Sequence, residues 1–191
     1  MTPPFRALSQ TQRLVLFAVL VVGVVAVCAL MRPYGRTMTE QTSPRGEHFG
    51  IVAFEIAGPE KAQTILATWG DEGQDAARTQ IRIDYAWLIL YASALAVACT
   101  ALGASLDGAW QRRGKATARL ALIAGALDAV ENTALLRVLA GDPYPGARAA
   151  QSAAYAKFAL VAVVLAYLVI GLFPLALQLR RRHTARKAAS P

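Results

Sequence analysis

Three long runs of the sequence contain no charged residue, and they constrain the fold more than any other feature. They cover residues 14–31, 85–106 and 158–179. Apolar runs of about 18 residues or more are long enough to cross the hydrocarbon core of a bilayer as an α-helix. The chain is 55% hydrophobic, but a soluble domain would spread these residues periodically rather than in blocks. The predicted class is therefore an all-α, polytopic membrane protein.

The first run also resembles the apolar part of a secretory signal peptide, because Arg6 and Arg13 precede it. That part of a signal peptide usually has only about 7–15 residues and leads to a cleavage site of small residues. Residues 14–31 are longer, and no clean site follows them. We therefore expect a retained membrane anchor.

A fourth segment, residues 120–140, is apolar but contains Asp128, Glu131 and Arg137. Each charge costs about 2.5–3.5 kcal/mol near the centre of a bilayer and less near its edge. The segment would therefore insert poorly alone. Its assignment depends on the positions of the basic residues in the rest of the chain.

Basic residues favour the cytoplasmic side of a membrane. Four spans put the basic residues before the first run, those between the second and third spans, and the tail 180–191 on one side. Three spans would place this tail on the opposite side. We therefore predict a single membrane domain in the cell membrane, a four-helix bundle with both termini in the cytoplasm and with spans at about 14–31, 85–106, 120–140 and 158–179.

This topology makes residues 32–84 an extracytoplasmic loop. Residues 32–48 are rich in Pro, Gly, Ser and Thr, which is typical of irregular chain. The apolar run 49–58 is interrupted by Glu55 and is too short to span a membrane. It is predicted to be a re-entrant or interfacial segment, or a strand.

The rest of the loop has a helical pattern. Pro59 is suited to a first helical turn, Gly70 to a stop, and the residues between them carry one apolar face. That face consists of Ala62, Ile65, Leu66 and Trp69. Residues 71–84 form a second predicted helix that runs into the second span, so we expect a helical lid on the outer surface of the membrane.

The polar residues of the fourth segment share one helix face. Asp128, Glu131 and Asn132 are spaced i, i+3 and i+4, and small residues lie along the same face. Such a face is expected to point into the bundle, with the carboxylates roughly 12–16 Å deep. Two neighbouring carboxylates in a low dielectric repel each other, so at least one is expected to be protonated. Asp128 and Glu131 are thus the candidate acid–base pair.

Residues from other segments are candidates for the same site. Asp84, Trp87 and Tyr91 share a face of the second span, and Arg82 and Lys157 are candidate counter-ions at the outer mouth. The predicted ligand-binding residues are Asn132, Tyr91, Tyr167, Asp84, Trp87 and Glu55. The alternative is that the polar residues only link helices and the aromatic residues form an interfacial belt.

The sequence lacks the residues that several kinds of chemistry require. His48 and His183 lie outside all four spans, so haem ligation by paired histidines within the membrane is excluded. The sequence has no phosphate-binding loop, no nucleophile elbow and no zinc spacing, and we predict neither metal nor cofactor. Cys28 and Cys99 fall at different depths and are not expected to pair. The basic tail is interpreted as a topology anchor that attracts anionic lipid, not as a nucleic-acid site.

Three functions follow from this pattern. The first is binding of a lipid or lipophilic small molecule at Asp128, Glu131 and Asn132, with or without acid–base chemistry, so whether the protein is an enzyme stays open. The second is a structural or accessory subunit with a membrane protein partner or a second copy of the chain. The third is proton-coupled transport. The sequence favours them in that order.

Overall fold

The computed structural model describes residues 8–106 and 108–188, and these residues form helices and connecting turns without a strand. The helices are α1 (Gln10–Glu40), α2 (Ile51–Glu55), α3 (Pro59–Ser105), α4 (Ala109–Leu139) and α5 (Pro143–Ala188). The predicted all-α class is confirmed. Arg6 and the last three residues of the predicted tail lie outside the described residues.

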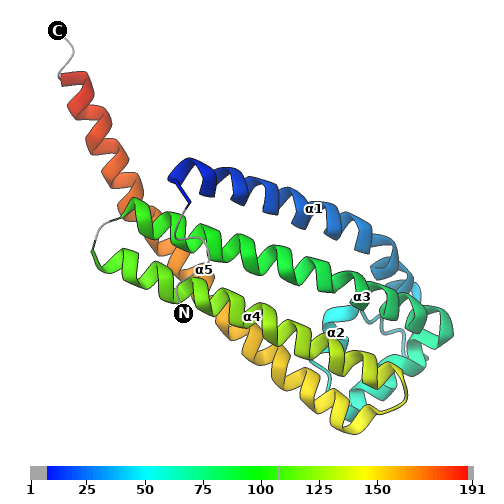
Figure 1. Ribbon diagram of the computed structural model, residues 1–191. Coiled ribbons are helices and arrows are strands. Elements are labelled where there is room, and N and C mark those ends of the chain that lie inside the picture. Colours follow the sequence, from blue (N-terminus) through cyan, green and yellow to red (C-terminus); the bar gives the residue numbers. More distant parts are fainter. Residues whose placement is uncertain (1–7, 107, 189–191) are drawn as a thin grey trace.

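The four long helices run alternately in opposite directions along one bundle (Figure 1). The main packing interfaces are those of α3 with α1, of α3 with α4 and of α4 with α5. A smaller interface joins α3 to α5, while α1 has no substantial interface with α5. Beyond the bundle, the end of α5 extends away from the other helices.

The two ends of the bundle differ in composition. At the basic end, which holds the start of α1 and the turn between α3 and α4, the Gln10 amide donates to the Ser105 hydroxyl at 3.0 Å. The first turns of α4 contribute Arg112, Arg113 and Lys115 there. The opposite end, which we call the cap end, holds α2, the end of α1, the start of α3 and the turn between α4 and α5.

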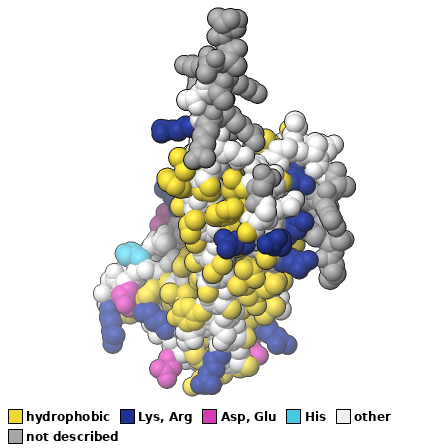
Figure 2. Space-filling view, turned by 90° about the vertical axis from the view of Figure 1, so that its left-hand side faces the viewer, with side chains coloured by type: hydrophobic (Ala, Val, Ile, Leu, Met, Phe, Trp, Pro, Cys, Tyr) yellow, Lys and Arg dark blue, Asp and Glu magenta, His cyan; other side chains and the backbone are white. Residues whose placement is uncertain are grey.

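In the part of the chain that the structure describes, three helical segments are long and apolar enough to cross a membrane: α1, α3 and the Pro143–Gln178 part of α5. Exposed large apolar side chains follow α1 and α5, where a soluble protein would have polar ones. Figure 2 shows the molecule from the basic end, with hydrophobic side chains over much of this face and Lys and Arg side chains among them. The helix α4 is as long as α1, but it is not apolar enough to be a candidate span by composition. Charged residues occupy its first turns and its buried face.

The loop predicted over residues 32–84 is more regular than expected. The helix α1 continues through Pro33 to Glu40, because Met38 is completely buried in the cluster at the cap end and packing there outweighs the proline. Residues 49–58 contain the short helix α2 rather than a strand. The two helices expected at 59–84 are merged into α3 with a kink at Gly70, where φ is +56°.

A hydrophobic cluster holds α2 in place at the cap end. The rings of Phe54 and Trp69 meet edge to face at 5.0 Å, and the Trp69 indole donates to the Phe49 carbonyl at 2.8 Å. The predicted apolar face of residues 59–69 is confirmed, because Ala62, Ile65 and Trp69 are buried there and Leu66 packs against them. The cap is therefore a folded part of the bundle.

Small residues bring α3 and α4 close together. A Cβ added at Gly125 would lie 2.7 Å from the Cβ of Ala92, and one at Gly114 would lie 2.6 Å from the Cys99 carbonyl oxygen. Neither contact is tolerated without movement of a helix. This close approach fixes how the polar face of α4 is presented to its neighbours.

Candidate functional site

The polar face of α4 points into the bundle as predicted. Asp128, Glu131 and Asn132 have exposed fractions of 2%, 0% and 3%, and the small residues on the same face, Ala121, Ala124 and Gly125, are also buried. Side chains three and four residues apart lie one above the other on a helix. The two carboxylates and the amide therefore form one continuous polar surface inside the protein.

Lys157 of α5 is the centre of this surface. Its ammonium nitrogen lies 2.9 Å from Asp128 Oδ1, 2.8 Å from Glu131 Oε2 and 3.6 Å from Glu55 Oε2. The side chain is almost completely buried, with a residue exposure of 6%. The sequence suggested a counter-ion at an outer mouth, whereas the structure places this cation within the bundle, joined to α2 and α4.

A second polar link joins α3 to α4. The Asn132 amide donates to Asp84 Oδ2 at 2.7 Å, and the hydroxyls of the adjacent residues, Tyr85 and Thr133, lie 2.8 Å apart. The predicted residues Asp84, Asp128, Glu131 and Asn132 are therefore brought together at one level of the bundle.

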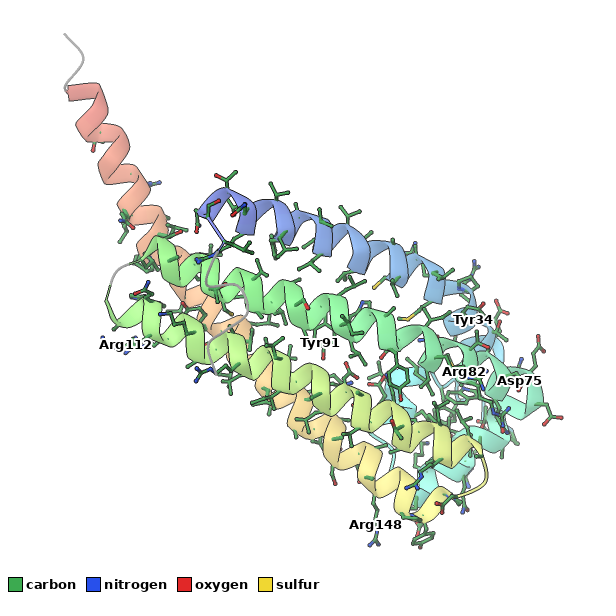
Figure 3. The ribbon with its side chains drawn as sticks, in the orientation of Figure 1. Tyr34, Asp75, Arg82, Tyr91, Arg112 and Arg148 are labelled. Carbon is green, nitrogen blue, oxygen red and sulfur yellow. The ribbon has the colours of Figure 1, made fainter. Side chains whose placement is uncertain are left out.

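Tyr91 and Trp87 extend this level toward α1. Their rings lie 4.4 Å apart, and the Trp87 indole donates to Cys28 Sγ at 3.0 Å. Tyr91 lies near the middle of the bundle, between Arg82 toward one end and Arg112 at the other (Figure 3). Tyr91 is 8% exposed, and its hydroxyl has no hydrogen-bond partner among the described residues.

These groups form one end of a cavity of about 570 Å³ between α1, α3 and α5. Its polar lining consists of Glu55, Gln80, Asp84, Trp87, Tyr91, Asp128, Asn132 and Lys157. Most of the remaining wall is aliphatic or aromatic, and on α1 it runs from Phe17 to Met31. At a rise of 1.5 Å per residue that wall is about 21 Å long. The cavity thus combines an apolar wall along α1 with a group of polar residues, which on α3 extends from Gln80 to Tyr91 and which we call the polar end.

The charges at the polar end do not balance. Glu55, Asp128 and Glu131 share one ammonium group, and Asp84 adds a further carboxylate. Two unit charges about 4 Å apart interact by roughly 4 kcal/mol at an effective dielectric constant of about 20. Burial raises the pKa of Glu55 above its usual range, and the neighbouring Lys157 opposes that rise. The site therefore has a surplus of proton and cation acceptors.

Some predicted residues lie elsewhere. The Tyr167 hydroxyl donates to the Trp110 carbonyl at 3.2 Å near the basic end, and Tyr167 does not line the cavity. Glu131 contacts Lys157 but does not line the cavity, so Asp128 is the member of the predicted acid–base pair that a ligand can reach. Arg82 is exposed and is not one of the lining residues.

Three residues of the site were not among the predicted ligand-binding residues. Gln80 lines the cavity and is 8% exposed, and Cys28 and Lys157 line it too. Cys28 and Cys99 are free thiols, as expected. A lysine just before an apolar run reads as an interfacial anchor, but α5 begins at Pro143, so Lys157 lies several turns inside it. A helix start signal at Pro143 could have revealed this.

Among the described residues no group of three potential metal ligands is arranged to hold a metal ion. The polar end therefore offers hydrogen bonds and charge. No family model, curated protein or solved structure matches the chain. Its function must be argued from the geometry of this site.

Proposed function

We propose that this chain is an integral membrane protein that binds a lipid or another lipophilic small molecule in the cavity. The observation that carries the proposal is the combination of a long apolar wall with a buried polar end that is only partly satisfied. Ligand cavities of about 300–1,000 Å³ with apolar walls and a few convergent polar groups are typical of small-molecule sites. The volume of 570 Å³ is within that range.

The polar face of α4 also supports its role as the fourth span. Its carboxylates contact Lys157 and its amide contacts Asp84, so the cost of burying them is offset inside the bundle rather than in lipid. With α4 as a span, the basic end faces the cytoplasm together with both termini, and the cap end faces outward. The ligand would then bind in the outer half of the membrane.

Asp128 is the residue placed for acid–base chemistry on such a ligand. Its Oδ1 contacts Lys157, while its Oδ2 has no hydrogen-bond partner among the described residues. A carboxylate positioned by a cation and presenting a free oxygen to a cavity can accept a proton from a bound molecule. Binding is the proposal, and proton transfer by Asp128 is its catalytic extension.

A structural or accessory role is the second candidate. Lys157 links α5 to α2 and α4, and the Gln151 amide donates to the Ile56 carbonyl at 2.8 Å in the same region. Such contacts fix one packing arrangement without any ligand. This candidate gives no reason for a cavity beside unsatisfied polar atoms, and it is therefore second.

Native mass spectrometry of the protein released from nanodiscs tests the proposal. Ala94 lines the cavity, so Ala94→Phe would fill it without changing any charge. Ala86 lies on the exposed side of the same helix, and Ala86→Phe is the matched control. We expect a small-molecule adduct on the wild type and on Ala86→Phe, and its loss from folded Ala94→Phe. An adduct retained by Ala94→Phe, or none on the wild type, would contradict the proposal.

A further inference from the structure

The polar end of the cavity carries more hydrogen-bond acceptors than donors. Three carboxylates line it, those of Glu55, Asp84 and Asp128, and one ammonium group, that of Lys157. Lys157 already contacts two of these carboxylates, and it also contacts Glu131 at 2.8 Å. A ligand would therefore meet more oxygen atoms that can accept a hydrogen bond than groups that can donate one.

Unsatisfied polar atoms point to a ligand independently of this charge count. Asp128 Oδ2, Gln80 Oε1 and the Tyr91 hydroxyl have no hydrogen-bond partner among the described residues. All three residues line the cavity and are more than nine-tenths buried. A buried polar atom without a partner is costly, so a donor placed among these atoms would be stabilising.

We propose that the natural ligand is a single-chain amphiphile with a protonated amine as its head group. This inference rests on the proposed binding function and specifies its chemistry. The ammonium group lies among Glu55, Asp84 and Asp128, donating to the carboxylates. The alkyl chain follows the apolar wall of α1, which is lined by Val21, Val24 and Phe17.

Charge decides against other head groups. A fatty acid or a phosphate would add a group with a negative charge to a site where the one cation among the described lining residues already contacts three carboxylates. An alcohol could donate one hydrogen bond but would leave the surplus charge unchanged. An ammonium group supplies up to three donors and the missing positive charge.

The packing of the helices provides an entrance for such a molecule. The cavity is lined on one side by Val24 and Cys28 of α1 and on the other by Phe158 and Val161 of α5. These two helices have no substantial interface with each other, and both carry exposed apolar side chains. The ligand therefore enters sideways from the lipid between α1 and α5.

Photo-crosslinking with three matched dodecyl chains tests this inference. Each chain carries a diazirine near its middle, and the heads are an amine, an alcohol and a carboxylate. The intact protein in phosphatidylcholine nanodiscs is labelled with and without excess unmodified dodecylamine, and mass spectrometry locates the labelled peptides. We expect competed labelling of the α1 and α5 walls by the amine at least about tenfold above that by the other two, as charged hydrogen bonds imply.

Two folded variants and one control complete the experiment. Asp128→Asn and Glu55→Gln should each lower the competed amine labelling severalfold, while Asp71→Asn, which removes an exposed carboxylate of α3, should not. Glu55 lies outside the long helices, so Glu55→Gln keeps the test decisive if Asp128→Asn fails to fold. Equal or stronger labelling by the alcohol or the carboxylate would overturn the amine assignment but leave cavity binding in place. No competed labelling by any chain would overturn both.

Discussion

Lys157 is the single residue on which the polar site most depends. It is the common partner of Asp128 and Glu131 of α4 and of Glu55 of α2, so its contacts join three helices when its own helix α5 is included. Taking one member out of a buried ion pair leaves a charge without compensation, which is more costly than the pair itself is worth. Its contribution therefore concerns the stability of the fold as well as the ligand site.

We expect Lys157→Met to lower the free energy of unfolding by about 3–5 kcal/mol. The control is Lys61→Met, which breaks an ion pair with Glu47 whose side chains are 48% and 45% exposed. Exposed pairs contribute about 0–1 kcal/mol. Urea unfolding in detergent measures the free energy of unfolding of both variants and of the wild type. A loss at Lys157 no larger than that at Lys61 would show that the carboxylates do not need this cation.

Glu55 makes stability depend on pH. Its pKa is raised in the folded protein by burial, so the folded state binds the proton more tightly than the unfolded state does. The resulting stability is fully present below the ordinary pKa of a glutamate and is lost as pH rises through the raised value. The groups facing Glu55 are Lys157, Asp128 and Glu131.

The expected result is a wild-type melting temperature that falls from about pH 4 upward across the range in which Glu55 loses its proton. The variant Glu55→Gln cannot ionise there and should show a flatter profile than the wild type, while Glu60→Gln, at an exposed position, should not change the slope. Melting curves between acid and neutral pH measure this difference. Parallel profiles for wild type and Glu55→Gln would contradict the assignment.

At the scale of the helices, the close packing of α3 on α4 positions the site. Gly125 lies one turn before Asp128, and a Cβ there would come within 2.7 Å of the Cβ of Ala92. We expect Gly125→Ala to cost about 1–3 kcal/mol, since added atoms in a packed interface force a shift. Gly35→Ala is the control, because its Cβ would meet the nearest atom at an ordinary 3.6 Å.

A double variant identifies the cause of that loss. Combining Gly125→Ala with Ala92→Gly removes the methyl group that the new Cβ would meet, and it should restore part of the lost stability. The interaction energy from the double-mutant cycle is the measurement. If the stability losses of Gly125→Ala and Ala92→Gly simply add in the double variant, the contact between these two positions is not the cause of the loss at Gly125.

The same helices show what the sequence could predict. The inward orientation of the polar face of α4 could be predicted from residue spacing alone, because Asp128, Glu131 and Asn132 recur at helical intervals beside small residues. The partner Lys157 could not be placed in the same way, since its contact with Asp128 joins residues 29 positions apart and depends on where α5 begins. The extension of α1 through Pro33 was missed because distant packing of Met38 overrides the local signal.

For the molecule as a whole, the number of membrane spans depends on whether α4 crosses the membrane. Three helices are apolar enough by composition, and α4 is not. If α4 does not cross, the turn before it and the turn after it lie on the same side of the membrane. If it crosses, they lie on opposite sides, with the basic turn in the cytoplasm.

Single cysteines distinguish these topologies. Gln111 and Asp142 are exposed residues at the two ends of α4. Gln111→Cys and Asp142→Cys are prepared with Cys28 and Cys99 replaced by alanine, and intact cells are treated with a thiol reagent that cannot cross membranes. We expect labelling at position 142 before lysis, and at position 111 only after it. Equal labelling of both positions in intact cells would show that α4 does not cross the membrane, and it would contradict the proposed entry of a ligand from the lipid.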